Sequence, residues 1–166
     1  MLKKKNILIL ISIILILVIA IILCMLTNKA YKDNYSSKEL YNLVSESFAT
    51  DGGVRILESD VILEFSEEDI SYLEDFIVVK ANNAKNINEI GIFRVEAGTA
   101  KELKPLIDKY VSNLQKSYRA MDYFPEEVEK IDFSKVTVFG DYVIYSFLNE
   151  KDTVSFYRNI EKNIRK

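Results

Sequence analysis

The chain has 166 residues, enough for one domain with a single core but too few for two ordinary domains. Its formal net charge of −3 at pH 7 includes no basic excess, which argues against a nucleic-acid-binding protein. Histidine is absent and Cys24 is the only cysteine, so the composition excludes an imidazole base, an intrachain disulfide and a zinc site built from cysteines.

The amino end carries an apolar run at residues 7–26, in which Ser12 is the only polar residue apart from the cysteine. A helix of this length rises about 30 Å, the thickness of the hydrocarbon core of a bilayer. Three lysines at residues 3–5 precede the run, as in a secretory signal. The sequence therefore predicts a cytoplasmic tail at 1–6, a transmembrane anchor at 7–26 and a juxtamembrane linker at 27–35.

Two other fates of the amino end remain open. Cleavage as a signal peptide normally needs small residues before the cut, and the A-x-A pattern is missing here. Lipidation of Cys24 normally needs a small residue before the cysteine, where this chain has Leu23. Lysines flank the apolar run on both sides, but the leading triplet and the free amino terminus favour an amino end inside the cell. We therefore expect residues 36–166 to form one extracytoplasmic domain at the cell membrane.

The first predicted element of that domain is an amphipathic helix after the linker. Ser36 and Glu39 have capping-box spacing, and the glycine pair at residues 52–53 ends the helical pattern. Its apolar residues are Leu40, Leu43, Val44 and Phe48. The acidic stretch at 58–75 lacks the spacing of a calcium-binding loop, so no metal site is predicted in it.

Two strands are predicted next, at residues 72–81 and 89–97, with a turn at 82–86 between them. Both strands are apolar on both faces, which is typical of central strands covered on each side. Arg94 interrupts the second strand, and we interpret it as a charge at the rim of the sheet.

A long helix follows, for which Thr99 and Glu102 form a second predicted capping box. Pro105 falls within its first two turns, where the lost backbone hydrogen bond matters least. Phe124 and Pro125 end this helix, and Pro125 starts a short one through residue 131. The stripe expected to face the core is Leu103, Leu106, Ile107, Tyr110, Val111, Leu114, Tyr118 and Met121.

The last predicted elements are a hairpin and a helix. Strands at 135–139 and 142–148 flank Gly140 and Asp141, a two-residue turn signal. Asn149 caps the last helix, whose expected core residues are Val154, Tyr157, Ile160 and Ile164. The chain is thus predicted to be α+β: one N-terminal transmembrane helix, then a mainly antiparallel sheet of about four strands with helices packed on it.

Three segments together resemble a bacterial family named domain of unknown function four-three-five-eight. They are the strand at 88–95 with its leading acidic residue, the helix end at 123–127, and the turn at 140–143 about fifteen residues on. The resemblance covers roughly residues 37–148. It implies an uncharacterised anchored or lipoprotein domain outside the cytoplasm, and it assigns no activity and no catalytic residues.

The sequence contains no glycine-rich phosphate loop, G-x-S-x-G elbow or S-x-x-K pair, so no catalytic, cofactor-binding or metal-binding residue is predicted. Carboxylate pairs such as Glu64 with Glu68, or Glu126 with Glu129, occur in any acidic protein. We predict a non-catalytic, membrane-anchored domain that contacts the bilayer through residues 7–26. It would bind a protein or cell-envelope partner, not nucleic acid, through an aromatic surface patch. The alternative is a carboxylate-dependent hydrolase acting on a cell-wall polymer.

Overall fold

The structure, a computed structural model of the full chain, describes residues 13–19, 31, 34–45, 54–56, 65, 70–121 and 125–165. The chain divides into two compact units, and Tyr31–Arg165 make up the larger one. Of the predicted anchor at 7–26, residues 13–19 are described, and they are helical with exposed side chains. Among all the described residues there is no helix with both the length and the apolar character needed to cross a bilayer. The predicted tail at 1–6 and nearly all of the acidic stretch at 58–69 lie outside the described residues.

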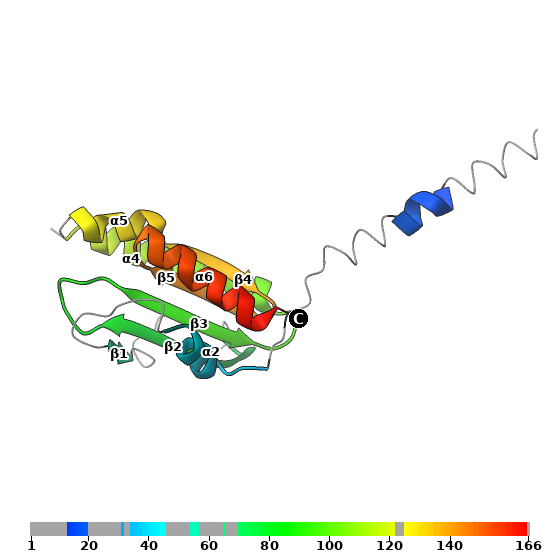
Figure 1. Ribbon diagram of the computed structural model, residues 1–166, viewed down its shortest axis with the longest axis horizontal. Coiled ribbons are helices and arrows are strands. Elements are labelled where there is room, and N and C mark those ends of the chain that lie inside the picture. Colours follow the sequence, from blue (N-terminus) through cyan, green and yellow to red (C-terminus); the bar gives the residue numbers. More distant parts are fainter. Residues whose placement is uncertain are drawn as a thin grey trace, which may run out of the picture. The chain divides into compact units, whose positions relative to one another are not determined.

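An antiparallel sheet with the strand order β1-β2-β3-β5-β4 organises the larger unit (Figure 1). The strands are β1 (Val54–Ile56), β2 (Leu73–Ala81), β3 (Glu89–Val95), β4 (Lys135–Phe139) and β5 (Tyr142–Phe147). The two predicted strand pairs are confirmed, and both are antiparallel hairpins. Gly140 in the turn between β4 and β5 has a φ of 57°, the left-handed conformation that glycine adopts without strain. Within the described residues the sheet has five strands, because the three-residue β1 adds to the four predicted ones at the β2 edge.

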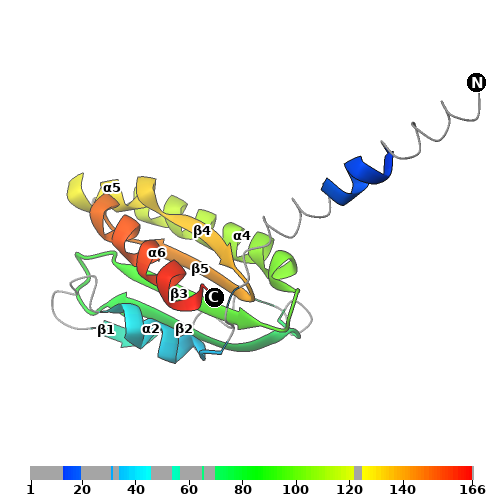
Figure 2. The same ribbon diagram turned by 45° about the vertical axis from the view of Figure 1, so that its right-hand side comes forward.

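Helices cover both faces of the sheet, which confirms the α+β class (Figure 2). One core cluster joins α2 (Ser37–Val44) and α6 (Glu150–Ile164) to the face carrying Ile77 and Val79. The second cluster joins α4 (Ala100–Arg119) and α5 (Pro125–Phe133) to the opposite face, which carries Val78. Because successive side chains of a strand point to opposite faces, the continuous apolar runs of β2 and β3 supply both cores.

Two of the three predicted helix caps are confirmed. Ser36 and Glu39 form a capping box, in which the backbone N–H of Ser36 donates to the Glu39 carboxylate at 2.8 Å. Asn149 Oδ1 accepts from the backbone N–H of Asp152 at 2.8 Å. The cap predicted at Thr99 is wrong, because its hydroxyl donates instead to the carbonyl oxygen of Glu96 at 2.8 Å.

Three residues expected in the core are exposed instead: Leu43, Met121 and Val154. In the short helix α2, only Leu40 and Val44 reach the core cluster, and Leu43 lies on its outer flank. Met121 follows the end of α4 at Arg119, so the helical spacing no longer applies to it. In α6 the buried stripe is Thr153, Phe156, Tyr157, Ile160 and Ile164, which leaves Val154 outside.

Tyr31 and Tyr35, at the start of the larger unit, contact the rest of that unit. Tyr31 forms an isolated antiparallel bridge with Arg165, and its ring meets that of Phe139 edge-on at a centroid distance of 6.1 Å. The Tyr142 hydroxyl donates to the carbonyl oxygen of Tyr35 at 2.6 Å. Residues that the sequence assigns to a linker thus contact both the hairpin β4–β5 and the end of α6.

Because two tyrosines are buried, we expect the free energy of unfolding to fall at alkaline pH. Burial raises the pKa of Tyr145 well above its ordinary value of 10.0, and the Glu89 carboxylate adds to the effect; burial also raises the pKa of Tyr157. A tyrosine hydroxyl with a higher pKa in the folded than in the unfolded state stays neutral in the fold after it would ionise in the unfolded chain. Its contribution to the free energy of unfolding is therefore complete below about pH 10 and is lost as the pH rises towards the folded-state pKa. In that pH range each of the two hydroxyls lowers the free energy of unfolding by up to about 1.4 kcal/mol per pH unit.

Urea unfolding at about pH 9 and about pH 11 checks this expectation. The free energy of unfolding should fall between the two, and the Tyr157→Phe variant should show a smaller fall. A parent protein equally stable at both values would contradict the prediction.

Candidate functional site

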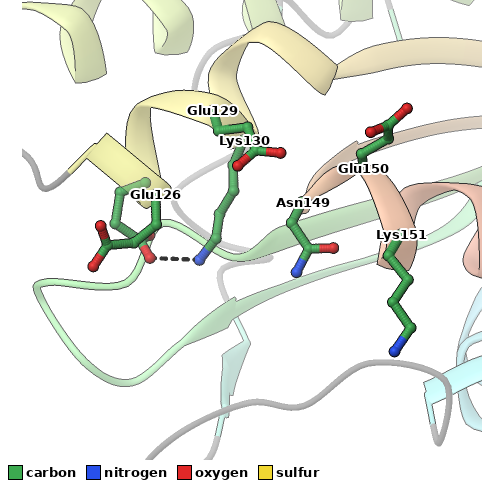
Figure 3. Close-up of a pocket in the computed structure, with 7 residues that line it drawn as sticks. Glu126, Glu129, Lys130, Asn149, Glu150 and Lys151 are labelled. Carbon is green, nitrogen blue, oxygen red and sulfur yellow. Dashed lines mark hydrogen bonds and ion pairs between the residues drawn. The ribbon is translucent and has the colours of Figure 1, made fainter.

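A hollow of about 510 Å³ lies between the first turns of α5 and α6 and is open to solvent (Figure 3). Four of its lining side chains are exposed at the rim: Glu126, Glu129, Glu150 and Lys151. The other lining residues are Glu127, Lys130 and Asn149. The rim therefore offers three carboxylates and one ammonium group to anything that enters from the solvent.

A buried ion pair forms the inner wall of this hollow. The Lys130 ammonium donates to Glu127 Oε1 at 2.6 Å, and both side chains are about nine-tenths buried. Glu127 Oε2 accepts from the backbone N–H of Ile87 at 2.8 Å, and the ammonium also reaches Asn86 Oδ1 at 3.3 Å. Each oxygen of the Glu127 carboxylate thus has a partner within the fold, and the pair ties α5 to the turn between β2 and β3.

The opposite wall is the start of α6, where Asn149 occupies the N-cap. Its side-chain oxygen accepts from the backbone of Asp152, and its amide group donates to the Asp152 carboxylate at 2.9 Å. Glu150 follows in the first turn, where the positive end of the helix dipole favours a carboxylate. With a net negative rim, the hollow suits ammonium or guanidinium groups on a partner.

A second polar cluster lies inside the sheet, around Glu89, which is 2% exposed. Its carboxylate accepts from the hydroxyls of Tyr145 at 2.6 Å and Tyr118 at 3.0 Å. Lys80, its neighbour across the strand pair, lies 3.4 Å from the same carboxylate and donates to the Tyr118 hydroxyl. The Glu89 carboxylate is thus enclosed by protein, whereas the Lys80 side chain is 18% exposed, and the cluster joins side chains of β2, β3, β5 and α4.

Of the two carboxylate pairs that the sequence offers for hydrolysis, the structure describes one. Glu126 and Glu129 both line the hollow, whereas Glu64 and Glu68 lie outside the described residues. Arg94 lies at the end of β3, where its guanidinium is 2.9 Å from the Glu74 carboxylate, as expected for a rim charge.

The predicted aromatic patch has no counterpart at the hollow. In the described ranges of the larger unit, the exposed large hydrophobic side chains are Leu43, Met121 and Val154, and none of the described aromatic side chains is exposed. Within the described parts of the chain, no group of three acidic or cysteine side chains is arranged to hold a metal ion.

The sequence did not predict that Glu89 and Glu127 are buried and hydrogen-bonded within the fold. Glu89 carries a signal, an acidic residue at the start of a mainly apolar strand, and Lys80 becomes its partner only through the register of β2 and β3. Glu127 and Lys130 carry the weaker signal of opposite charges three residues apart on a helix.

Comparison with known proteins gives one match. A family model described as Domain of unknown function (DUF4358) matches residues 65–148, from the approach to β2 through the whole of β5. No curated protein and no solved structure matches the chain. The matched range includes Glu89 and the α5 wall of the hollow, while the α6 wall follows it.

Proposed function

The chain belongs to the DUF4358 family of domains of unknown function, and on that premise we propose that it is a membrane-anchored binding domain outside the cytoplasm. Its partner is a protein or a component of the cell envelope, and its site is the hollow between α5 and α6. The domain binds without catalysing a reaction.

The anchoring part of the proposal draws on the apolar run at 7–26 and on the position of Tyr31. If the run spans a bilayer, only residues 27–30 separate it from Tyr31, and four residues extend about 14 Å at most. A domain held on so short a tether meets partners in or near the same membrane. Such confinement raises the effective concentration of a partner, so a weak surface is sufficient for binding.

One observation supports binding over catalysis: the buried carboxylates of Glu89 and Glu127 are bonded within the fold, and those at the rim of the hollow are exposed. Glu89 and Glu127 accept hydrogen bonds from backbone or side-chain groups. Carboxylate-dependent hydrolysis needs an acid held in an environment that raises its pKa and excludes water. An open rim with both charge signs instead matches the polar edge of a protein–protein contact.

A charge-reversal pull-down tests the site. Full-length protein, solubilised in mild detergent, is compared with the double variant Glu126→Lys/Glu150→Lys, which reverses two charges at the rim. The matched control is Glu96→Lys/Glu102→Lys, which makes the same change at exposed positions elsewhere. We expect partner recovery to fall about tenfold or more in the rim variant, because like charges across an interface cost several kcal/mol, and to be kept in the control.

Two outcomes of that experiment would overturn the proposal. Equal recovery by the parent and the rim variant would remove the hollow as the site. Turnover of a wall polymer that is abolished by Glu126→Gln or Glu129→Gln, with no partner recovered, would establish the hydrolase instead.

The location is tested separately. Full-length protein should sediment with membranes after cell breakage without detergent, and protease added to intact cells should remove the domain. A chain that stays dissolved after high-speed centrifugation would contradict the anchor. A domain that survives on intact cells but is cut after lysis would reverse the orientation.

A further inference from the structure

The two edges of the sheet differ in what they offer to another strand. At one edge, β1 has three residues; at the other, β4 has five, Lys135–Phe139 (Figure 2). Three of these five are β-branched, and Lys135 at the beginning is the only charged one. Proteins usually blunt an exposed edge with charges, proline or a bulge, because its unpaired backbone groups are a template for further pairing. Lys135 supplies a charge at the start of β4, whereas residues 136–138 have none of these protections.

The hydrogen-bond pattern of the sheet identifies the backbone groups that point outward. The carbonyl oxygen of Asp141 accepts from the N–H of Val95 at 2.9 Å, so the odd-numbered residues of β5 bond to β3. The even-numbered residues of β5 therefore bond to β4, where their partners are Lys135, Thr137 and Phe139. It follows that Val136 and Val138 direct their N–H and C=O groups away from β5. The described residues supply no strand on that side.

We propose that the β4 edge binds a second copy of this chain, forming an antiparallel pair of β4 strands with a two-fold axis at Thr137. In this register Val136 lies opposite the partner's Val138, and Thr137 opposite the partner's Thr137. Both valines are the residues whose backbone groups point outward, so each of the two Val136–Val138 pairs exchanges two hydrogen bonds. The two sheets then continue into one another across the axis.

The side chains of β4 are complementary to themselves in this register. Val136 and Val138 lie on the face of α4 and α5, and both are half-buried, so pairing them with each other covers apolar surface. Thr137 with Thr137 is a favourable cross-strand pair. Lys135 meets the partner's Phe139 rather than another lysine, and its ammonium already lies 4.2 Å from the ring centroid of Tyr157. No like charges face one another along the strand.

A single strand pair buries less surface than a stable soluble dimer needs, so the contact depends on local concentration. That part of the argument rests on the proposed membrane anchor, which confines copies of the chain to one surface. A self-complementary strand favours a second copy over an unrelated extended peptide, because every copy carries the matching sequence in the required geometry.

Disulfide cross-linking tests the register directly. Residues facing each other in a non-hydrogen-bonded antiparallel pair have Cα atoms about 4.5 Å apart, within the range that a disulfide spans. Cys24 is the only native cysteine, so Cys24→Ser gives a cysteine-free background for Thr137→Cys. The full chain is placed in phospholipid vesicles and oxidised, and the dimer is measured on a non-reducing gel. The matched control is Lys162→Cys, at an exposed position on α6 that does not line the hollow.

We expect Thr137→Cys to form dimer at least about tenfold faster than the control, as set by effective concentration. Adding Val138→Pro should return the rate to the control level, because proline removes an outward N–H that β5 does not use. Val136→Pro is an independent second blocking variant, and thermal melting identifies any variant that no longer folds.

Two results would overturn the inference: cross-linking of Thr137→Cys at the control rate, or undiminished cross-linking in a folded proline variant. The same measurement in detergent separates it from the proposed function. Cross-linking there at high protein concentration supports the edge contact even if fractionation finds no membrane anchor.

Discussion

Replacing Gly91 with alanine is expected to lower the free energy of unfolding by about 3 kcal/mol, at the upper end of the usual cost of overpacking. Gly91 in β3 lies directly opposite Tyr145 in β5. A Cβ atom at residue 91 would lie 2.1 Å from Cε1 of the tyrosine ring and 2.7 Å from Cδ1 and Cζ. The ring cannot move aside cheaply, because it packs against Phe93, Tyr110 and Phe147 and its hydroxyl is bonded to Glu89.

Two comparisons isolate this clash. Gly98→Ala makes the same chemical change where nothing lies within 4 Å of the new atom, and there only the positive φ of 85° costs stability, about 1 kcal/mol. In a Tyr145→Ala background the space is free, so Gly91→Ala should cost little or slightly stabilise the strand. Urea unfolding of the four variants gives the coupling. An equal cost of Gly91→Ala in both backgrounds would contradict the assigned contact.

Gly91 also shows why part of the fold could be predicted from the sequence and part could not. The apolar run around it, with side chains for both faces, was sufficient to predict a central strand, because that pattern depends on local spacing. The need for glycine depends on β5 lying next to β3, a pairing between residues more than fifty positions apart. No local pattern encodes which two hairpins join or in what register.

The helix ends make the same distinction on a smaller scale. The caps at Ser36 and Asn149 were predicted because each capping residue and the backbone N–H that it accepts from lie within four residues of sequence. Thr99 has the same spacing to an acidic residue, but its hydroxyl has a competing acceptor in the Glu96 carbonyl. Serine and threonine often choose such a nearby backbone partner, and the choice depends on the loop conformation before the helix.

Only the α5 side of the candidate site could be predicted from the sequence. The spacing of Glu126 and Glu129 places them on neighbouring positions of one helix, which the sequence shows. That Glu150 and Lys151 lie across a hollow from them follows from the packing of α5 near the start of α6, with the hairpin of β4 and β5 between the two helices in the chain. Charged residues at the starts of two helices carry no signal that the helices meet.

The second large effect is expected at Glu89, where Glu89→Ala should lower the free energy of unfolding by about 3–5 kcal/mol, the usual cost of breaking a buried ion pair. The variant leaves two tyrosine hydroxyls and the Lys80 ammonium without their shared acceptor inside the sheet. The matched control is Glu102→Ala, an exposed glutamate whose loss should cost about 0.5 kcal/mol or less. Equal costs for the two variants, measured by urea unfolding at neutral pH, would contradict a network held by Glu89.

A combined variant shows how much of the stability lost in Glu89→Ala comes from the polar groups that are left without their acceptor. Glu89→Leu with Lys80→Met and Tyr145→Phe removes both charges and one hydroxyl, so nearly all the groups that needed the carboxylate disappear with it. A buried ion pair replaced as a unit by apolar residues is often neutral or stabilising. We therefore expect this triple variant to be more stable than Glu89→Ala by about 2 kcal/mol or more. A triple variant no more stable than Glu89→Ala would contradict this account, because the loss in the single variant would then not come from the groups that it leaves unpaired.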